Sequence, residues 1–213
     1  MRTSDHFVKL NKMAGGDFMA KIAWKDIEKA AKTLGLEPCA LSAVCQVEAD
    51  GDGFLPDGRP KILFEGHVFW KELKKVGIAP EQYAASNANI LYPKWTKAHY
   101  QGGAKEYDRL NRAKRIHEDA ALKSASWGAF QIMGFNYAVC GCGSVQEFVE
   151  AMHGGYAGQL EMLGGFLKAN NLIRHLNSRN WAAFARGYNG SGYTVNSYDV
   201  NLRQAYEKCV ISK

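Results

Sequence analysis

The chain has 213 residues, of which 46% are hydrophobic and 23% charged, which is enough for one compact domain with an apolar core. Its net charge of +6 and sequence pI near 9.0 favour polyanionic partners, either nucleic acid or an anionic cell-envelope surface. Its mean hydropathy is −0.31 and it has no run of about eighteen apolar residues, so we expect no stable membrane insertion.

The first 24 residues are weakly patterned and are expected to form a tail or a short helix, ahead of a single domain over residues 25–213. They carry early charges but lack an apolar signal-peptide core, so we expect synthesis in a cytoplasm. The next segment, WKDIEKAAKTLG, repeats apolar residues with helical spacing and ends on Gly35, a suitable C-terminal cap.

A second helix is predicted to have Pro38 in its first turn and Glu48 in its last turn, before Gly51 and Gly53 end it, and its apolar stripe continues onto Glu48. Burial and the C-terminal end of the helix dipole both disfavour a negative charge, so the pKa of Glu48 is predicted to be raised. A carboxylic acid that stays protonated near neutral pH can protonate the leaving oxygen of a glycosidic bond. The alternative is a helix-end glutamate turned towards solvent.

The following segment, FLPDGRPKILFE, contains a Pro-Asp-Gly turn signal between apolar residues and predicts a short β-hairpin beside this helix. It ends on Glu65, which no turn chemistry explains, so we expect Glu65 to face Glu48 as the second carboxylate. Three other residues stay open as alternatives: Asp50, Asp52 and Asp57. A separation of about 5–5.5 Å would imply retention and one of about 6.5–9.5 Å inversion.

Several helices follow. Val68, Phe69, Leu73 and Val76 are expected to face inwards from a helix that begins after Glu65. Residues 78–123 are rich in Tyr and Lys and predict one or two helices with a basic face, either a solvated lobe or a surface for glycan or anionic polymer. We expect a mainly α (α+β) fold with one small β element.

The C-terminal third is also predicted to be helical. Ser144 and Glu147 form a capping box that opens a long helix to about Asn170, in which the glycine pairs 154–155 and 164–165 indicate close packing or a break. Ser178 is the expected cap of a later helix, and a last helix runs through Cys209.

The five cysteines are Cys39, Cys45, Cys140, Cys142 and Cys209. They show no C-x-x-C or Cys/His zinc spacing, so we expect ordinary reduced thiols, with Cys45 in the core. The histidines have no metal-ligand spacing either, and no metal or organic cofactor is expected.

Three segments follow one another along the chain: VEADGDGF with Glu48, SWGAFQIMG at 126–134 and ARGYNGSGY at 185–193. This order resembles the goose-type lysozyme and lytic transglycosylase superfamily. More closely, GFLPDGRPKILFEGHVF resembles the hallmark stretch of the phage endolysin N-acetylmuramidase family. The resemblance covers about residues 25–210 and implies a lysozyme-like helical domain.

The resemblance also implies roles for individual residues. Glu48 matches the catalytic general acid, and Glu65 matches the hairpin carboxylate of the family block. The other matching positions are cleft residues that bind sugar and support the acid: Ser126, Gln131, Tyr188 and Asn189. His67 is either a cleft partner or a structural residue.

The expected function is therefore that of an endolysin that cleaves the β-1,4 bond between N-acetylmuramic acid and N-acetylglucosamine and lyses the host. The alternatives are a lytic transglycosylase that leaves 1,6-anhydro ends, and a non-catalytic wall-binding protein. Nucleic-acid binding is indicated by charge alone, and no recognised motif supports it. The expected partners are peptidoglycan glycan strands and an anionic envelope surface. We expect a monomer that stays in the host cytoplasm until a holin-type pore releases it.

Overall fold

The computed structural model describes residues 22–49 and 52–213. The expected N-terminal tail and the candidate Asp50 lie outside these residues.

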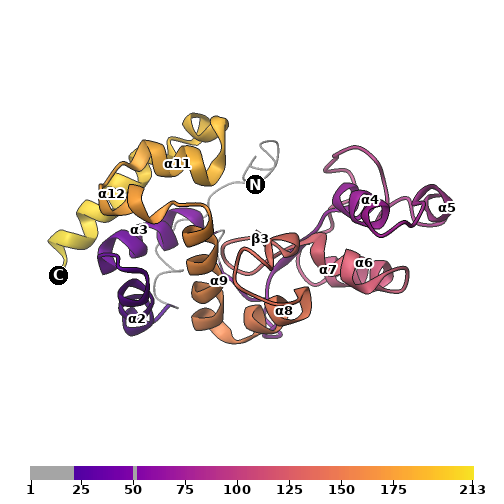
Figure 1. Ribbon diagram of the computed structural model, residues 1–213, viewed down its shortest axis with the longest axis horizontal. Coiled ribbons are helices and arrows are strands. Elements are labelled where there is room, and N and C mark those ends of the chain that lie inside the picture. The colour runs from indigo at the N-terminus through magenta and orange to yellow at the C-terminus, as the bar shows by residue number, and fades with distance from the viewer. Residues whose placement is uncertain (1–21, 50–51) are drawn as a thin grey trace.

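Figure 1 shows two helical parts with a small sheet and α8 between them. One part holds α2 (Trp24–Leu34), α3 (Pro38–Glu48), α9 (Gly155–Ala169), α10 (Ile173–Asn177), α11 (Trp181–Asn189), η2 (Ser191–Asn196) and α12 (Tyr198–Ile211). The other holds α4 (Gly66–Lys75), α5 (Glu81–Ala84), α6 (Lys105–Lys114) and α7 (Glu118–Lys123). The elements between them are β1 (Ile62–Phe64), β2 (Ala125–Trp127), β3 (Ile132–Met133), η1 (Gly134–Asn136) and α8 (Val145–His153).

The two helices expected before Glu48 are confirmed. Gly35 ends α2 in the left-handed conformation, with φ +64°, and Pro38 occupies the first turn of α3. The predicted apolar stripe of α3 is buried along its length, Glu48 included. α2 packs against α9 and α12 lies along α3, so α3 is enclosed by helices from distant parts of the chain.

The small sheet has three antiparallel strands in the order β1-β2-β3. The Pro-Asp-Gly turn forms, but its two arms meet only at an isolated bridge between Phe54 and Pro60. β1 pairs with β2 instead, with Leu63 opposite Ser126, and the extended hairpin is β2–β3. The fold class is confirmed, but the extent of the hairpin was wrong, because a turn signal specifies local chain reversal and not the partner of a buried strand.

The predicted long helix is broken at its first glycine pair. Ser144 caps α8 by accepting a hydrogen bond from the Glu147 amide, and α9 begins at Gly155 with φ +81°. The second pair packs closely: a Cβ at Gly165 would lie 2.3 Å from the Cys140 carbonyl oxygen. The first glycine pair therefore breaks the helix and the second allows close packing, so both predicted roles of glycine occur between residues 144 and 170.

Two smaller predictions on helices were wrong. Ser178 ends α10, and α11 is capped instead by Asn180, whose side chain accepts a hydrogen bond from the Ala183 amide at 3.1 Å. Val76 lies beyond the end of α4 and is 46% exposed.

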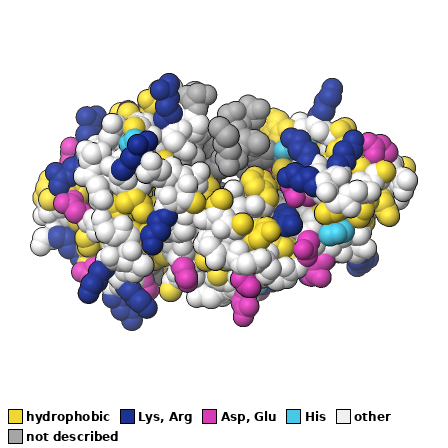
Figure 2. Space-filling view, viewed as in Figure 1, with side chains coloured by type: hydrophobic (Ala, Val, Ile, Leu, Met, Phe, Trp, Pro, Cys, Tyr) yellow, Lys and Arg dark blue, Asp and Glu magenta, His cyan; other side chains and the backbone are white. Residues whose placement is uncertain are grey.

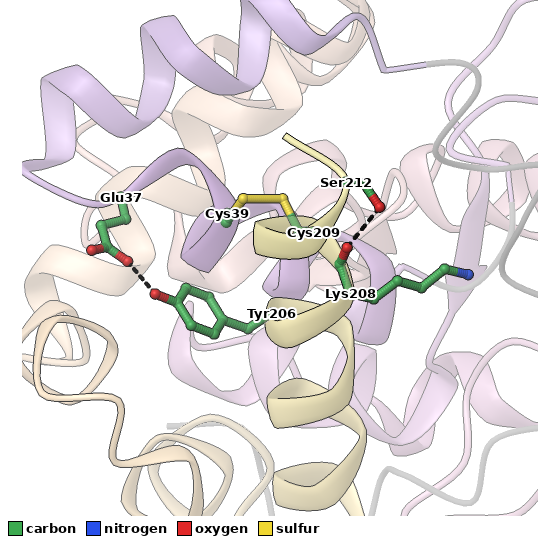
Figure 3. The surroundings of a disulfide bond; sticks show 6 residues. All are labelled: Glu37, Cys39, Tyr206, Lys208, Cys209 and Ser212. Atoms are coloured by element: carbon green, nitrogen blue, oxygen red, sulfur yellow. Dashed lines mark hydrogen bonds between the residues drawn. A yellow bond between two sulfur atoms is a disulfide. The ribbon is translucent and has the colours of Figure 1, made fainter.

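The cysteine expectation was wrong for one pair, because Cys39 and Cys209 form a disulfide bond between α3 and α12 (Figure 3). The two residues are 170 positions apart, so no local spacing of cysteines in the sequence could predict this disulfide. Beside it, the Tyr206 hydroxyl donates to Glu37 Oε2 at 2.6 Å. Cys45 is a core thiol as predicted, and burial raises its pKa to about 12.

None of the helices in residues 22–49 and 52–213 combines the length and the apolar character that a membrane span needs.

Candidate active site

Glu48 is the last residue of α3 and its side chain is only 3% exposed. Asn189, the last residue of α11, donates its side-chain amide to Glu48 Oε1 at 3.0 Å. The predicted burial of Glu48 is thus confirmed. Burial and the C-terminal end of α3 both disfavour the ionised form of this carboxyl group.

Tyr188 is part of the core that orients α11. Its ring is 1% exposed, stacks on Phe184 at 5.5 Å between centroids and meets the edge of Phe166 at 5.7 Å. This packing fixes the rotation of α11 and directs Asn189 towards Glu48. A direct role of Tyr188 in sugar binding stays a prediction.

Backbone hydrogen bonds join three segments near Glu48: the loop after α3, the turn segment and the β2–β3 turn. The Lys61 amide donates to the Gly53 carbonyl at 2.9 Å, which ties the turn segment to the loop after Glu48. The Gly128 amide donates to the Lys61 carbonyl at 2.8 Å, which adds the β2–β3 turn. Gly53, Lys61 and Gly128 thus link these segments into one hydrogen-bonded backbone framework beside the site.

Ser126 and Gln131 contact each other within that backbone framework. Ser126 Oγ donates to Gln131 Oε1 at 2.7 Å, and Gln131 Nε2 donates to the Gly128 carbonyl at 2.8 Å. Gln131 has φ +46°, which is uncommon for a residue other than glycine and is often retained at functional sites. The pair fixes the shape of the turn, and its contact with sugar stays a prediction.

Glu65 lies between β1 and α4 and its side chain is 1% exposed. The Tyr100 hydroxyl donates to Glu65 Oε2 at 2.7 Å, and His67 Nδ1 lies 3.4 Å from the same oxygen. Burial and the facing Glu65 carboxylate raise the pKa of Tyr100, so its hydroxyl remains a donor over the working pH range. Glu65 is therefore a buried carboxylate in a polar setting.

The alternative carboxylates have other partners. Asp57 is exposed in the turn and forms an ion pair with Arg59 at 2.6 Å, and that hydrogen-bonded contact lowers the pKa of Asp57. Asp52 accepts hydrogen bonds from the Tyr156 hydroxyl at 2.6 Å and from the Phe54 amide at 3.2 Å. Turn geometry therefore accounts for Asp57.

Comparison with known proteins places this geometry in a family. The N-acetylmuramidase family profile matches residues 37–210. The chain belongs to that family. The crystal structure of a Burkholderia AP3 phage endolysin is similar, with a TM-score of 0.82 and 40% sequence identity over 88% of this chain and 71% of that one. A comparison with curated proteins gave no match.

Family membership makes the chain a glycoside hydrolase that acts on peptidoglycan. It confirms the resemblance to phage endolysins of the muramidase type and the lysozyme-like fold. In residues 22–49 and 52–213 of this muramidase, no cluster of three His, Cys, Asp or Glu side chains is arranged to hold a metal ion. The roles of the individual site residues stay predictions.

The sequence did not reveal Gln159, a fully buried residue of α9 that supports the muramidase site. Its Oε1 accepts from the Ala129 amide at 2.8 Å, and its Nε2 lies 3.4 Å from the Gly53 carbonyl oxygen, to which it donates. A Cβ at Gly53 would lie 2.6 Å from Gln159. Gln159 could have been found as the polar residue among the apolar positions of α9. Its side chain lies against Gly53 and Gly128, which belong to two of the motifs.

Proposed function

We propose that the protein is an endolysin that hydrolyses the β-1,4 bond between N-acetylmuramic acid and N-acetylglucosamine and so lyses its host. The observation that carries this proposal is the 3.0 Å hydrogen bond from Asn189 to Glu48, which joins the two family motifs at the ends of α3 and α11. It holds a buried carboxyl group in one orientation at a helix end, as a general acid requires.

In this proposal Glu48 donates its proton to the leaving glycosidic oxygen. Its burial and its place at the end of α3 disfavour the ionised form, which suits a proton donor. Asn189 Oδ1 is buried and accepts no hydrogen bond from the described residues. That oxygen is a suitable acceptor for a sugar hydroxyl or an N-acetyl N–H group.

Glu65 acts as the second carboxylate. The hydrogen bond that it accepts from Tyr100 favours its ionised form. An ionised carboxylate stabilises the oxocarbenium-like transition state or activates the attacking water. Two carboxyl groups in opposite environments are a recurrent arrangement for acid and base roles.

Several surrounding features fit the same function. Ser126, Gln131 and Tyr188 position the motifs that line the glycan. Figure 2 shows Lys and Arg side chains over both halves of the face drawn, which suits attraction to an anionic cell envelope. We propose a monomer that reaches the wall at lysis through a holin-type pore.

The deciding experiment is mass spectrometry of the fragments released from purified peptidoglycan, with and without borohydride reduction. Hydrolysis predicts reducible muramic acid ends. Anhydro ends would replace hydrolysis by transglycosylation, for which one acid/base carboxylate suffices. Absence of any released fragment would leave a wall-binding protein and overturn the catalytic assignment.

A further inference from the structure

The segment between α5 and α6, together with α6 itself, surrounds Glu65. Side chains between residues 92 and 109 contact its side chain and the backbone on both sides of it. The sequence left residues 78–123 as a solvated lobe or a glycan surface. Their buried polar residues instead point inwards, to the strand that ends before Glu65.

The side chain of Glu65 meets Tyr100. The phenol hydroxyl donates to Oε2 at 2.7 Å, a short hydrogen bond of the charge-assisted kind. Such a bond fixes both the rotamer of the carboxylate and the direction of its remaining lone pairs. A displacement of a reacting group by about 1 Å can cost two orders of magnitude in rate, so this constraint matters for catalysis.

The backbone just before Glu65 is held by a buried ion pair. Glu106 and Arg109 are 0% and 1% exposed and meet at 2.7 Å. Glu106 Oε2 accepts from the Phe64 amide at 3.0 Å, and Arg109 Nη1 donates to the Phe64 carbonyl at 2.8 Å. Both polar groups of one strand residue are thus bound by charged side chains.

The same ion pair holds the other end of the Tyr100 contact. Glu106 Oε1 accepts from the amides of Gln101 and Gly102, at 2.7 and 3.0 Å. The Arg109 guanidinium lies 6.0 Å from the centre of the Tyr100 ring. One buried pair therefore fixes the residues next to both partners of the hydrogen bond.

The backbone after Glu65 is held as well. The Gly66 amide donates to the Tyr92 hydroxyl at 3.3 Å. A Cβ at Gly66 would lie 2.4 Å from the Tyr92 ring and 2.7 Å from the Ile90 carbonyl oxygen. Only glycine permits this close approach, which brings the segment against the start of α4.

We propose that Tyr100 is a positioning residue for Glu65, and that the buried Glu106–Arg109 pair holds both sides of their hydrogen bond. The inference rests on the proposed role of Glu65 as second carboxylate. Burying two charges is costly, and an apolar pair would stabilise a merely structural lobe as well. A charged pair with several donors and acceptors instead gives directional control over the backbone at Glu65 and Tyr100.

The first test compares Tyr100→Phe with Tyr107→Phe on soluble, uncrosslinked peptidoglycan strands. Tyr107 is a matched control, because its hydroxyl also donates a 2.7 Å hydrogen bond, to the Pro60 carbonyl. Loss of a hydrogen bond to a charged group predicts a fall in kcat of about 10- to 100-fold for Tyr100→Phe, with KM unchanged. Equal kcat values in the two variants would overturn the proposal.

The second test is a double-mutant cycle with Glu65→Asp, which keeps the carboxylate but withdraws it from Tyr100. If Tyr100 acts through Glu65, adding Tyr100→Phe to Glu65→Asp costs less than twofold in kcat. A full, additive loss would show that Tyr100 acts elsewhere. A crystal structure of Tyr100→Phe should show the Glu65 carboxylate displaced and β1 unchanged, and an unmoved carboxylate would contradict the inference.

The two proposals fail in distinguishable ways. Glu65→Gln with wild-type activity would remove Glu65 from the mechanism and so contradict the proposed function. An inactive Glu65→Gln together with a fully active Tyr100→Phe would contradict the positioning role alone.

Discussion

Glu48 and Glu65 are both almost fully buried, yet the two regions that hold them differ. Glu48 ends a helix enclosed by other helices, and an uncharged amide donates to it. Glu65 follows a three-residue strand and is held by a phenol, a nearby imidazole and a backbone fixed by a buried ion pair. Equal burial therefore does not imply equal chemistry, because the local donors and dipoles decide which protonation state is favoured.

The two regions are also stabilised in different ways. The helical part around Glu48 relies on apolar packing and on a disulfide bond from Cys39 to Cys209. The part around Glu65 relies on directional polar contacts, among them those of Glu106 and Arg109. Removing each kind of support should therefore lower the stability of the fold to a different extent.

The largest expected effect on catalysis is that of Glu48→Gln. Loss of the general acid should lower the rate of fragment release by about 100- to 10,000-fold, with the melting temperature nearly unchanged. Fragment release from purified peptidoglycan measures this. Asp57→Asn is the control, because that carboxylate is exposed in the turn, and it should stay within about twofold of wild type. Unchanged release by Glu48→Gln would refute the assignment of the acid.

The largest expected effect on stability is that of Glu106→Ala. It leaves the Arg109 charge buried without its carboxylate, which typically costs about 3–5 kcal/mol. For a chain of this length that lowers the melting temperature by about 6–20 °C. Calorimetry measures it, with the exposed Glu81→Ala as control. A loss no larger than that of Glu81→Ala would contradict the view that polar contacts support the Glu65 region.

A smaller loss of stability is expected for Cys209→Ser. It opens a disulfide that closes a 170-residue separation, and such bonds typically contribute about 2–4 kcal/mol. Thermal unfolding with and without a reductant should show the same loss in the wild-type protein. Cys142→Ser, which alters a thiol outside the disulfide, is the control. Insensitivity of the wild-type melting temperature to reductant would count against the bond.

The smallest effect concerns the contact of Glu37 with Tyr206 in Figure 3. The Tyr206 hydrogen bond holds the pKa of Glu37 below its ordinary value, against a smaller opposing effect of burial. A lowered pKa in the folded state stabilises the protein above the unfolded-state value of about 4.3, and this stabilisation is lost as the pH falls through the folded-state value.

Tyr206→Phe should therefore lower the melting temperature slightly at pH 7, by about 1–3 °C, because exposed pairs contribute no more than about 1 kcal/mol. The difference from wild type should disappear in acid. Thermal unfolding between pH 2.5 and 7 tests this, and a difference independent of pH would assign the effect to packing of the ring instead.

Local sequence determined α2 and α3, the residues that begin and end them, and the burial of Glu48. Helical periodicity, Gly35 and Pro38 act over a few residues, so the pattern alone predicts α2 and α3. The order of three motifs indicated the lysozyme and lytic transglycosylase superfamily, and the stretch GFLPDGRPKILFEGHVF indicated the muramidase family. The catalytic roles of Glu48 and Glu65 stay predictions that the experiments above test.

Tertiary structure alone decided the pairing of β1 with β2, the disulfide and the surroundings of Glu65. The Tyr100 contact with Glu65 spans 35 positions, and the Asn189 contact with Glu48 spans 141. Tyr100 and Glu106 occur in segments whose local pattern shows only polarity, and Gln159 is a single polar residue among the apolar positions of α9. Their partners depend on how helices pack and strands align, and long-range contacts of this kind leave no periodic signal in a single sequence.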